Sequence, residues 1–274
     1  MGKVIAIVNQ KGGVGKTTTS VSLSAALAIL GKRVLLVDSD PQGNATSGLG
    51  VEKKSLSSSI YDIIIKQAEI ENVGLATEYG LDIVPSHIDL AGAEVELVAA
   101  ISRESRLKKA IDKVKNFYDY IIIDCPPSLG LLTLNSLVAA DSVLMPVQCE
   151  YYALEGLGQL MQTIDLVRNQ LNESLEVEGV LMTMYDSRTR LAEQVVDDVR
   201  SHFGDKVYET LIPRNIRLSE APSYGQPIFA YESNSKGAEA YMRLAQEVIA
   251  GEEEKNWWFG KRSGGFDSWH GKAC

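Results

Sequence analysis

Short runs of apolar and β-branched residues alternate with longer amphipathic stretches along most of the chain. The runs are continuous rather than alternating in polarity, which is typical of strands in a parallel sheet that is covered on both faces. Six segments are predicted to be such strands: residues 4–8, 34–37, 81–84, 120–123, 143–147 and 180–184.

The stretches between these runs have the spacing of amphipathic helices. Helices are predicted at residues 16–30, 106–115, 154–171, 192–203 and 238–250. Gly31 and Gly251 follow the first and the last of them, as expected for glycine just after a helix C-terminus. Strand–helix–strand alternation with short links implies right-handed crossovers. The predicted fold class is therefore α/β, with a doubly wound, mostly parallel sheet.

Neither an internal repeat nor a Pro/Ser-rich linker interrupts this pattern before residue 250, so residues 1–250 are predicted to form a single domain. Three consecutive glutamates at 252–254 then lead into Trp257-Trp258-Phe259 and a glycine-rich polar segment. This end of the chain has no apolar periodicity. Residues 251–274 are therefore expected to be a disordered or partner-dependent C-terminal tail.

Composition excludes several classes of protein. Of the 274 residues, 45% are hydrophobic and 23% are charged, which is enough to bury a full-sized core. The formal net charge of −9 argues against an evenly basic nucleic-acid binder but leaves room for a local basic patch. Cys125, Cys149 and Cys274 are too far apart for a CxxC pair, so a reduced cytosolic protein is expected. The sequence carries neither an export signal nor a membrane-span pattern, which also favours the cytoplasm.

A glycine-rich segment between the first predicted strand and helix carries the most specific chemistry; it reads Lys11-Gly12-Gly13-Val14-Gly15-Lys16-Thr17-Thr18. Glycines let backbone N–H groups converge on phosphate oxygens, and the helix that follows adds the positive end of its dipole. In this setting Lys16 reaches the β- and γ-phosphates, Thr17 offers its hydroxyl to Mg²⁺ and Thr18 approaches the α-phosphate. The segment predicts a nucleoside-triphosphate site that uses magnesium.

The loop departs from the common GxxxxGK[ST] pattern. Gln10 stands where the first glycine is expected, and Lys11 adds a second lysine at the front of the loop. A glycine-rich turn without a ligand is the alternative interpretation. The combination of strand, loop, Lys-Thr pair and helix favours phosphate binding.

Two acidic elements supply the carboxylates that a phosphate loop by itself does not contain. Asp124 ends the apolar run 120–123, in the manner of a Walker B carboxylate that holds hydrated Mg²⁺, and Pro126-Pro127 then start a stiff loop suited to sensing a γ-phosphate. Asp38 and Asp40 follow the run 34–37. Ligands of open parallel sheets bind beyond the carboxyl ends of the strands, so both elements are expected at the nucleotide. Either aspartate alone could be a turn cap.

Together these segments resemble the deviant-Walker ATPases of the MinD/ParA superfamily, and most of all the ParA/Soj partition proteins. The resemblance implies a P-loop NTPase fold of the deviant-Walker type. It rests on linked motifs over roughly residues 2–250: the loop at 11–18, Asp-Ser-Asp-Pro-Gln-Gly-Asn at 38–44, Ile-Asp-Cys-Pro-Pro at 123–127, Gln-Cys-Glu-Tyr-Tyr-Ala-Leu-Glu-Gly at 148–156, Ile-Pro-Arg-Asn at 212–215 and Ser-Glu-Ala-Pro-Ser at 219–223.

The resemblance implies a role for each matching residue of the ATP site. Lys11 would reach across an ATP-sandwich homodimer to the nucleotide of the partner subunit. Lys16 and Thr17 would bind the phosphates and Mg²⁺. Asp40 would orient the attacking water, and Asp124 would hold Mg²⁺ through water.

The remaining implied roles concern the base and DNA. Pro213 and Asn215 lie where relatives contact adenine, and Arg188 and Arg217 lie where relatives contact DNA. The implied function is an ATP-dependent dimerising switch in the cytoplasm that binds DNA non-specifically on the nucleoid. With a ParB/Spo0J-like centromere-binding partner, which stimulates its weak ATPase, it would drive chromosome or plasmid partition.

A MinD-like spatial regulator is the alternative, because it shares the ATPase site but attaches to membranes through a C-terminal amphipathic helix. Trp257 and Trp258 stand beside cations, as in membrane-interface segments. Gly260, Gly264 and Gly265 are expected to interrupt such a helix. Stable membrane association is therefore not expected.

Overall fold

The computed structural model describes residues 2–150 and 153–263. In this part of the chain a seven-stranded sheet has the order β3-β4-β2-β5-β1-β6-β7. The strands are β1 Lys3–Ile7, β2 Val34–Asp38, β3 Leu75–Ala76, β4 Asp82–Val84, β5 Tyr120–Asp124, β6 Ser142–Gln148 and β7 Glu176–Thr183. All neighbours pair in parallel except the edge strand β3, which is antiparallel to β4. The predicted doubly wound, mostly parallel α/β fold is confirmed.

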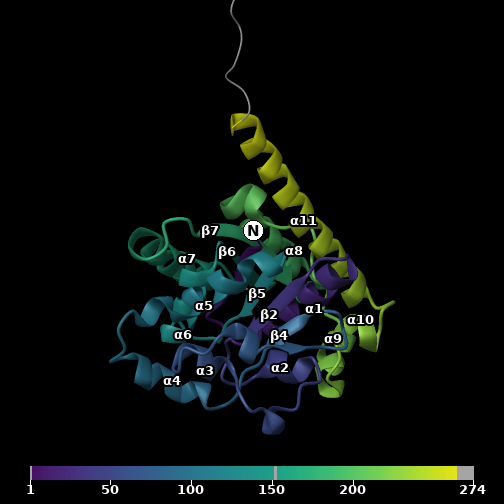
Figure 1. Ribbon diagram of the computed structural model, residues 1–274. Helices are drawn as coiled ribbons and strands as arrows, with labels where there is room; N and C mark the ends of the chain where they lie inside the picture. Colours follow the sequence, from purple (N-terminus) through teal and green to yellow (C-terminus); the bar gives the residue numbers. More distant parts are fainter. Residues whose placement is uncertain (1, 151–152, 264–274) are drawn as a thin grey trace, which may run out of the picture.

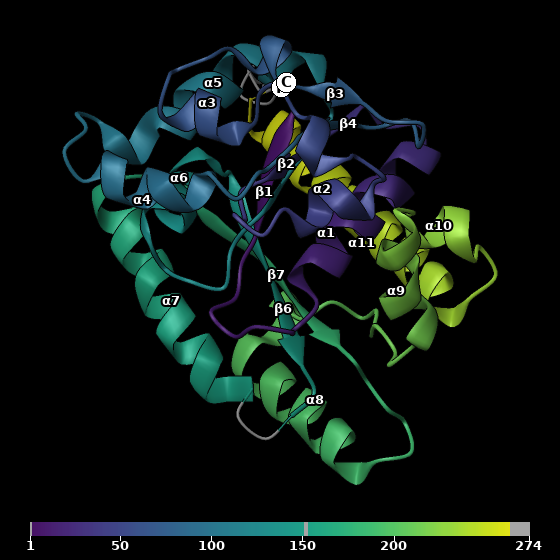
Figure 2. The same cartoon turned by 90° about the horizontal axis from the view of Figure 1, so that it is seen from below.

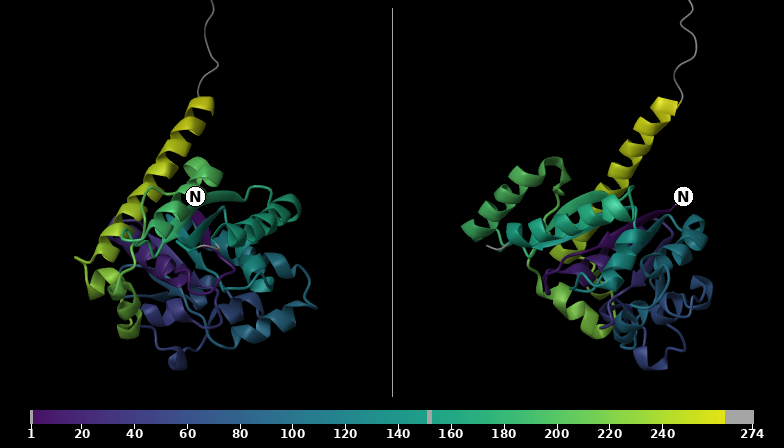
Figure 3. Two further views of the ribbon diagram at one scale, coloured as in Figure 1. Left: turned by 180° about the vertical axis from the view of Figure 1, so that it is seen from behind. Right: turned by 90° about the vertical axis from the view of Figure 1, so that its left-hand side faces the viewer.

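Helices cover both faces of the sheet (Figures 1 and 3). One face is packed by α1 Lys16–Ile29, α2 Asn44–Gly48, α9 Ile216–Glu220, α10 Ile228–Tyr231 and α11 Lys236–Ser263. The other face is packed by α3 Ile60–Ile64, α4 Leu90–Leu97, α5 Arg106–Val114, α6 Leu131–Ala139, α7 Ala153–Gln170 and α8 Arg190–Phe203. None of the helices within the described ranges is long and apolar enough to cross a membrane.

Strand β1 shows why the apolar runs are continuous. Val4 and Ala6 belong to the core on one face, whereas Ile5 and Ile7 belong to the core on the other, and all four are fully buried. Because side chains alternate across a strand and both faces are covered, every position has to be apolar.

The strand register brings the predicted site elements to one edge of the sheet. Asp124 at the end of β5 pairs with Ile7 of β1 on one side and with Asp38 of β2 on the other. The loops that follow these three strands therefore start at the same level. They lie at the carboxyl edge, where open α/β sheets bind ligands.

The predicted helix end at Gly251 is wrong, because α11 continues to Ser263 and passes both Gly251 and Gly260. A glycine inside a helix costs about 1 kcal/mol relative to alanine, which a tertiary contact can offset. Here Glu252, in the turn after Gly251, pairs with Lys3 at 3.1 Å. Figure 1 shows the helix extending beyond the body of the domain. The tail prediction for residues 251–263 is thus replaced by helix, and residues 264–274 lie outside the described part.

Candidate nucleotide site

The phosphate loop joins β1 to α1 and owes its shape to left-handed glycines. Gly13 and Gly15 have φ values of +75° and +90°, a region that residues with a Cβ rarely enter. A Cβ added at Gly12 or Gly13 would meet nothing within 4 Å, so the space above the loop is open. Thr183, at the end of β7, fixes the loop by donating from its hydroxyl to the Val14 carbonyl at 2.8 Å. The result is a rigid cradle with its concave side free.

Lys16 is held inside this cradle. Its side chain is buried, and its Nζ donates to the Lys11 carbonyl at 3.1 Å. Burial lowers the pKa of Lys16, and the nearby charges of Asp124 and Asp40 oppose that shift. A buried ammonium with a single backbone acceptor has donors left for phosphate oxygens.

Asp124 lies beneath the loop, is fully buried and has one unsatisfied oxygen. Ser20 on α1 donates to its Oδ1 at 2.8 Å, whereas Oδ2 has no hydrogen-bond partner among the described residues. Burial, and secondly the charge of Asp38, raise the pKa of Asp124. An unsatisfied, buried carboxylate next to the Thr17 and Ser20 hydroxyls favours the binding of a cation. The donor set suits Mg²⁺, which prefers oxygen ligands and keeps several waters.

The two aspartates after β2 do different things. Asp38 is fully buried, and its Oδ2 accepts from the Thr46 backbone N–H at 2.8 Å and from the Thr46 hydroxyl at 2.7 Å, so it serves the structure of the loop. Asp40 accepts from the Gln42 N–H at 2.9 Å. This bond caps the turn, which is the alternative role that the sequence allowed for such an aspartate. Its position between Asp38 and Gly43 keeps it on the loop that flanks the phosphates.

A cavity of about 340 Å³ adjoins the phosphate loop and contains the predicted adenine residues. Pro213 and Asn215 line it together with Thr18 and Tyr241. Asn215 Oδ1 accepts from the Arg217 N–H at 2.9 Å and so caps α9, which leaves its amide N–H groups available to a ligand. A flat apolar wall with one amide donor, next to the loop, suits a purine base.

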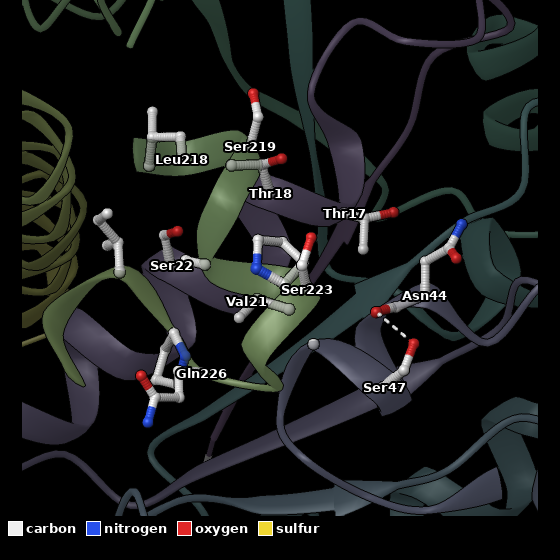
Figure 4. Close-up of a pocket in the computed structure, with 15 residues that line it drawn as sticks. Thr17, Thr18, Val21, Ser22, Asn44, Ser47, Leu218, Ser219, Ser223 and Gln226 are labelled. Carbon is white, nitrogen blue, oxygen red and sulfur yellow. Dashed lines mark hydrogen bonds between the residues drawn. The ribbon is translucent and has the colours of Figure 1, made fainter. Parts of the chain in front are cut away.

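A second cavity, of about 420 Å³, lies on the other side of Thr18 between α1, α2 and the segment around α9 (Figure 4). Its polar lining is neutral, with hydroxyls of Thr17, Ser22, Ser219 and Ser223. None of the residues that line it is charged. This cavity therefore offers no charged group to a phosphate, whereas the glycine loop offers Lys16.

Lys11 lies on the surface of the loop, and its Nζ pairs with Glu150 at 2.9 Å. Both side chains are nearly half exposed, so this pair is weak and easily exchanged for another. Tyr151 and Tyr152, from the family motif that follows Glu150, lie outside the described residues.

The two arginines predicted to bind DNA are both paired within the chain. Arg188 donates to Asp186 at 2.7 and 2.9 Å, and hydrogen bonding by Arg188 holds the pKa of Asp186 well below its usual range. Arg217 donates to Glu220 at 2.8 Å. The side chain of Arg188 is 85% exposed, against 48% for Arg217. Both remain reachable from solvent, but each carries its charge beside a carboxylate.

Sequence reasoning missed three residues that shape the site: Thr183, Ser20 and Tyr241. Thr183 lies one residue before the end of the predicted strand 180–184, near the carboxyl edge, which was a usable signal. Ser20 stands four residues after Lys16 and faces Asp124 from one turn further along α1. Tyr241 lies on α11 and donates to or accepts from Thr19 at 3.0 Å, a contact that only the fold creates.

A glycine cradle between a central strand and a helix, with strand-end aspartates beneath it, defines a phosphate-loop nucleotide-binding protein. Comparisons with known proteins narrow this class. A family model described as an AAA domain matches residues 2–177. The chain is 63% identical over 251 residues to the sporulation initiation inhibitor protein Soj of Bacillus subtilis, covering 91% of this chain and 99% of that protein. It is 51% identical over 256 residues to the chromosome partitioning protein ParA of Caulobacter vibrioides, covering 92% and 96%.

The chain belongs to the Soj/ParA family of chromosome-partitioning ATPases. Solved structures share the fold of this chain. Cobyrinic acid a,c-diamide synthase from Mycobacterium smegmatis, with a bound ATP analogue and magnesium, superposes with a TM-score of 0.82 at 41% identity, covering 92% of this chain and 96% of that one. The cell division ATPase MinD of Pyrococcus furiosus has a TM-score of 0.75 at 27% identity, covering 91% and 99%.

Proposed function

We propose that this protein is a partition ATPase that binds ATP with Mg²⁺, dimerises, binds DNA without sequence preference and hydrolyses ATP slowly until a ParB-like partner accelerates the reaction. Family membership supports the ATPase and partition parts. The open cradle, the buried Lys16 and the unsatisfied Asp124 support a magnesium nucleotide as the ligand. Cargo and partner are assigned only by class.

The site residues have distinct roles in this proposal. Loop N–H groups and Lys16 bind the β- and γ-phosphates, and Thr17 and Asp124 hold Mg²⁺, the latter through water. The bound ion supplies positive charge that neutralises the phosphates. Asp40 accepts a hydrogen bond from the attacking water and orients it towards the γ-phosphate. Phosphoryl transfer needs mainly this positioning and charge neutralisation.

The proposed dimer rests on the exposed front of the phosphate loop. Lys11, Gly12 and Gly13 are exposed, so the chain's own side chains leave the nucleotide open on that side. Lys11 is bound there only by the half-exposed Glu150. In a sandwich dimer Lys11 exchanges this partner for the phosphates of the facing subunit. A cation arriving in trans contributes about 10³–10⁵ in rate in related phosphoryl-transfer systems.

The test of the dimer compares Lys11→Ala with Lys113→Ala, which removes an equally exposed lysine paired with Glu69. Size-exclusion chromatography with light scattering is run with ATP and with ADP. We expect wild type and Lys113→Ala to dimerise with ATP, and Lys11→Ala to remain monomeric while still binding nucleotide. Normal dimerisation of Lys11→Ala would remove this residue from the proposal.

The DNA part is tested with a random-sequence duplex, using ATP or ADP at several salt concentrations. We expect binding only with ATP, and a steep loss of affinity with salt, because phosphate contacts release counterions. Arg188→Glu should weaken binding and reduce the salt slope by about 1. Arg243→Glu, which removes another exposed arginine from an ion pair, is the matched control. If both variants behave alike, Arg188 is not a DNA contact.

Anionic liposomes in the same assay distinguish the MinD-like alternative. The passage of α11 through Gly260 contradicts one of the three glycine interruptions expected at this end, whereas Gly264 and Gly265 lie outside the described residues. We expect ATP-dependent binding to the duplex and none to liposomes. The opposite result would replace DNA by a membrane as the surface on which the dimer works.

A further inference from the structure

The segment around helix α4 carries both buried and exposed apolar residues. Leu90, Ala93 and Leu97 are buried against the core, as expected for a helix that covers a sheet. Four exposed apolar residues, here named the α4 surface, lie in the same segment: Ile88 before the helix, Val95 on it, and Val98 and Ile101 after it. Val95 is 76% exposed and Ile101 is 89% exposed. Of the twelve large hydrophobic residues exposed in the described chain, these four fall within fourteen positions.

This concentration marks an interaction surface, because monomers rarely leave clustered large apolar side chains in water. Figure 2 shows α4 at the periphery beside α3 and α6, with its outer side free. Helix α4 itself, Leu90–Leu97, is about 12 Å long at 1.5 Å per residue. That length matches about two turns of a second helix laid along it.

The charge around the α4 surface selects the kind of partner. Asp89, Glu94 and Glu96 lie in the same segment. The nearest Arg or Lys along the chain is Arg103, which donates to the Val98 carbonyl at 2.7 Å and is paired with Glu104 at 2.8 Å. Lys66, on the neighbouring α3 side, is already paired with Asp62 at 2.8 Å. Carboxylates repel DNA and anionic lipid, and a second copy would bring its own carboxylates to the contact. A helix with an apolar face and Lys or Arg at its edges is the complementary partner.

The N-terminal end of the α4 surface is linked to the loop after β2. The Ser86 backbone N–H donates to the Thr46 hydroxyl oxygen at 2.8 Å, and that hydroxyl donates to Asp38 at 2.7 Å. Leu90, four residues after Ser86, is the first residue of α4. Two buried hydrogen bonds therefore connect the segment just before α4 with the strand end that precedes Asp40.

The middle and the far end of the segment contact the loop after β5. A Cβ added at Gly130 would lie 2.0 Å from Glu94 Oε1, so the Glu94 carboxylate rests against the backbone at the start of α6. That oxygen is buried and has no hydrogen-bond partner within the described chain. Asn135 of α6 also donates to the Arg103 carbonyl at 2.8 Å, just beyond the α4 surface. Gly130 follows Pro127 by three residues, so α4 also touches the γ-phosphate-sensing loop.

We propose that the α4 surface is the docking site for a cationic amphipathic helix of the partner that stimulates hydrolysis. This inference rests on the proposed function, because it assigns that partner a place on the chain. Docking buries Val95 and Val98, pairs the rim carboxylates with Lys or Arg, and moves both loops that flank the phosphates. Stimulation then comes from repositioned loop groups, without entry of the partner into the cradle.

The test uses the full chain with ATP, a DNA duplex and the ParB-like protein of the same genome. Val95→Ser/Val98→Ser removes the apolar contact, and Leu166→Ser, at an exposed position of α7, is the matched control. We expect unchanged basal ATPase and DNA binding for all variants. The double variant should need about tenfold more partner for half-maximal stimulation, because it lacks the two valine side chains that docking would bury in part. Asp89→Asn/Glu96→Gln should flatten the salt dependence of stimulation.

Hydrogen exchange separates failure of the docking site from failure of the proposed function. Protection of residues 88–101 by the partner, together with stimulation, supports both. Protection without stimulation keeps the docking site and removes partner-stimulated hydrolysis from the function. Absence of protection overturns the docking site, and so does stimulation of Val95→Ser/Val98→Ser at wild-type partner concentrations.

Discussion

Replacing Asp124 by asparagine is expected to stabilise the nucleotide-free protein at neutral pH and to weaken its response to magnesium nucleotide. Asp124 is fully buried, and its Oδ2 is unsatisfied among the described residues. Asparagine keeps an oxygen for the Ser20 hydroxyl, which donates at 2.8 Å, and removes the buried charge. The variant thus separates the loss of stability caused by burying Asp124 in the empty site from the contribution of Asp124 to nucleotide binding.

Asparagine still leaves a buried amide without a partner, so the gain comes from removal of the charge; we take it to be about 1–3 kcal/mol, the range for burial of an unsatisfied polar group. For a chain of this size each kcal/mol shifts the melting temperature by about 2–4 °C. We therefore expect Asp124→Asn to melt roughly 2–12 °C above wild type at pH 7.5 without nucleotide. The exposed control Asp112→Asn should stay within about 0.5 kcal/mol of wild type.

The stability gain of Asp124→Asn over wild type should increase as the pH rises. Burial raises the pKa of Asp124 above its ordinary value of 3.8, so near and above that value the folded state binds more protons than the unfolded state. Wild-type stability then falls as pH rises from about 4 towards the raised pKa, whereas asparagine does not titrate. The advantage of Asp124→Asn should vanish near pH 4 and be greatest above the raised pKa.

Differential scanning calorimetry in EDTA between pH 4.5 and 8 measures this difference, and a second series contains ADP with Mg²⁺. Bound ligand should raise the melting temperature of wild type and raise that of Asp124→Asn much less. The reasoning is refuted if the variant is less stable than wild type at pH 7.5 without ligand. A gain that does not change with pH would refute the electrostatic cause.

Two further predictions concern the frame of the site. Gly225→Ala forces a side chain into φ +65° with its Cβ 2.8 Å from the Gly50 Cα; it should lose at least about 1–2 kcal/mol in urea denaturation, and clearly more than Gly31→Ala, where φ is +79° and the space is open. Thr183→Val removes the donor to the Val14 carbonyl; we expect about 1 kcal/mol less favourable ATP binding by calorimetry, and unchanged affinity would show that the loop keeps its shape alone.

Much of the ATP site follows from local sequence, because its parts are short and sit at strand ends. A buried apolar run at residues 4–8, followed by Gly13, Gly15 and Lys16, predicts a strand, a glycine loop and a helix. The structure has each of them. Asp38 and Asp124 could be placed near the loop because parallel strands end at one edge, and the register confirms that placement. Periodicity and strand-end chemistry need no knowledge of distant contacts.

Only the tertiary structure decided features that depend on residues far apart in the sequence. Glycine at 251 predicts a helix end, yet the contact of Glu252 with Lys3 accompanies a longer helix. Tyr241 lines the cavity of Pro213 and Asn215 from α11, which no local pattern reveals. The segment around α4 has apolar residues that are buried and others that are exposed, and which of them are covered depends on where the sheet lies. Local pattern thus determines the elements and their chemistry, whereas packing determines which surfaces remain free to bind.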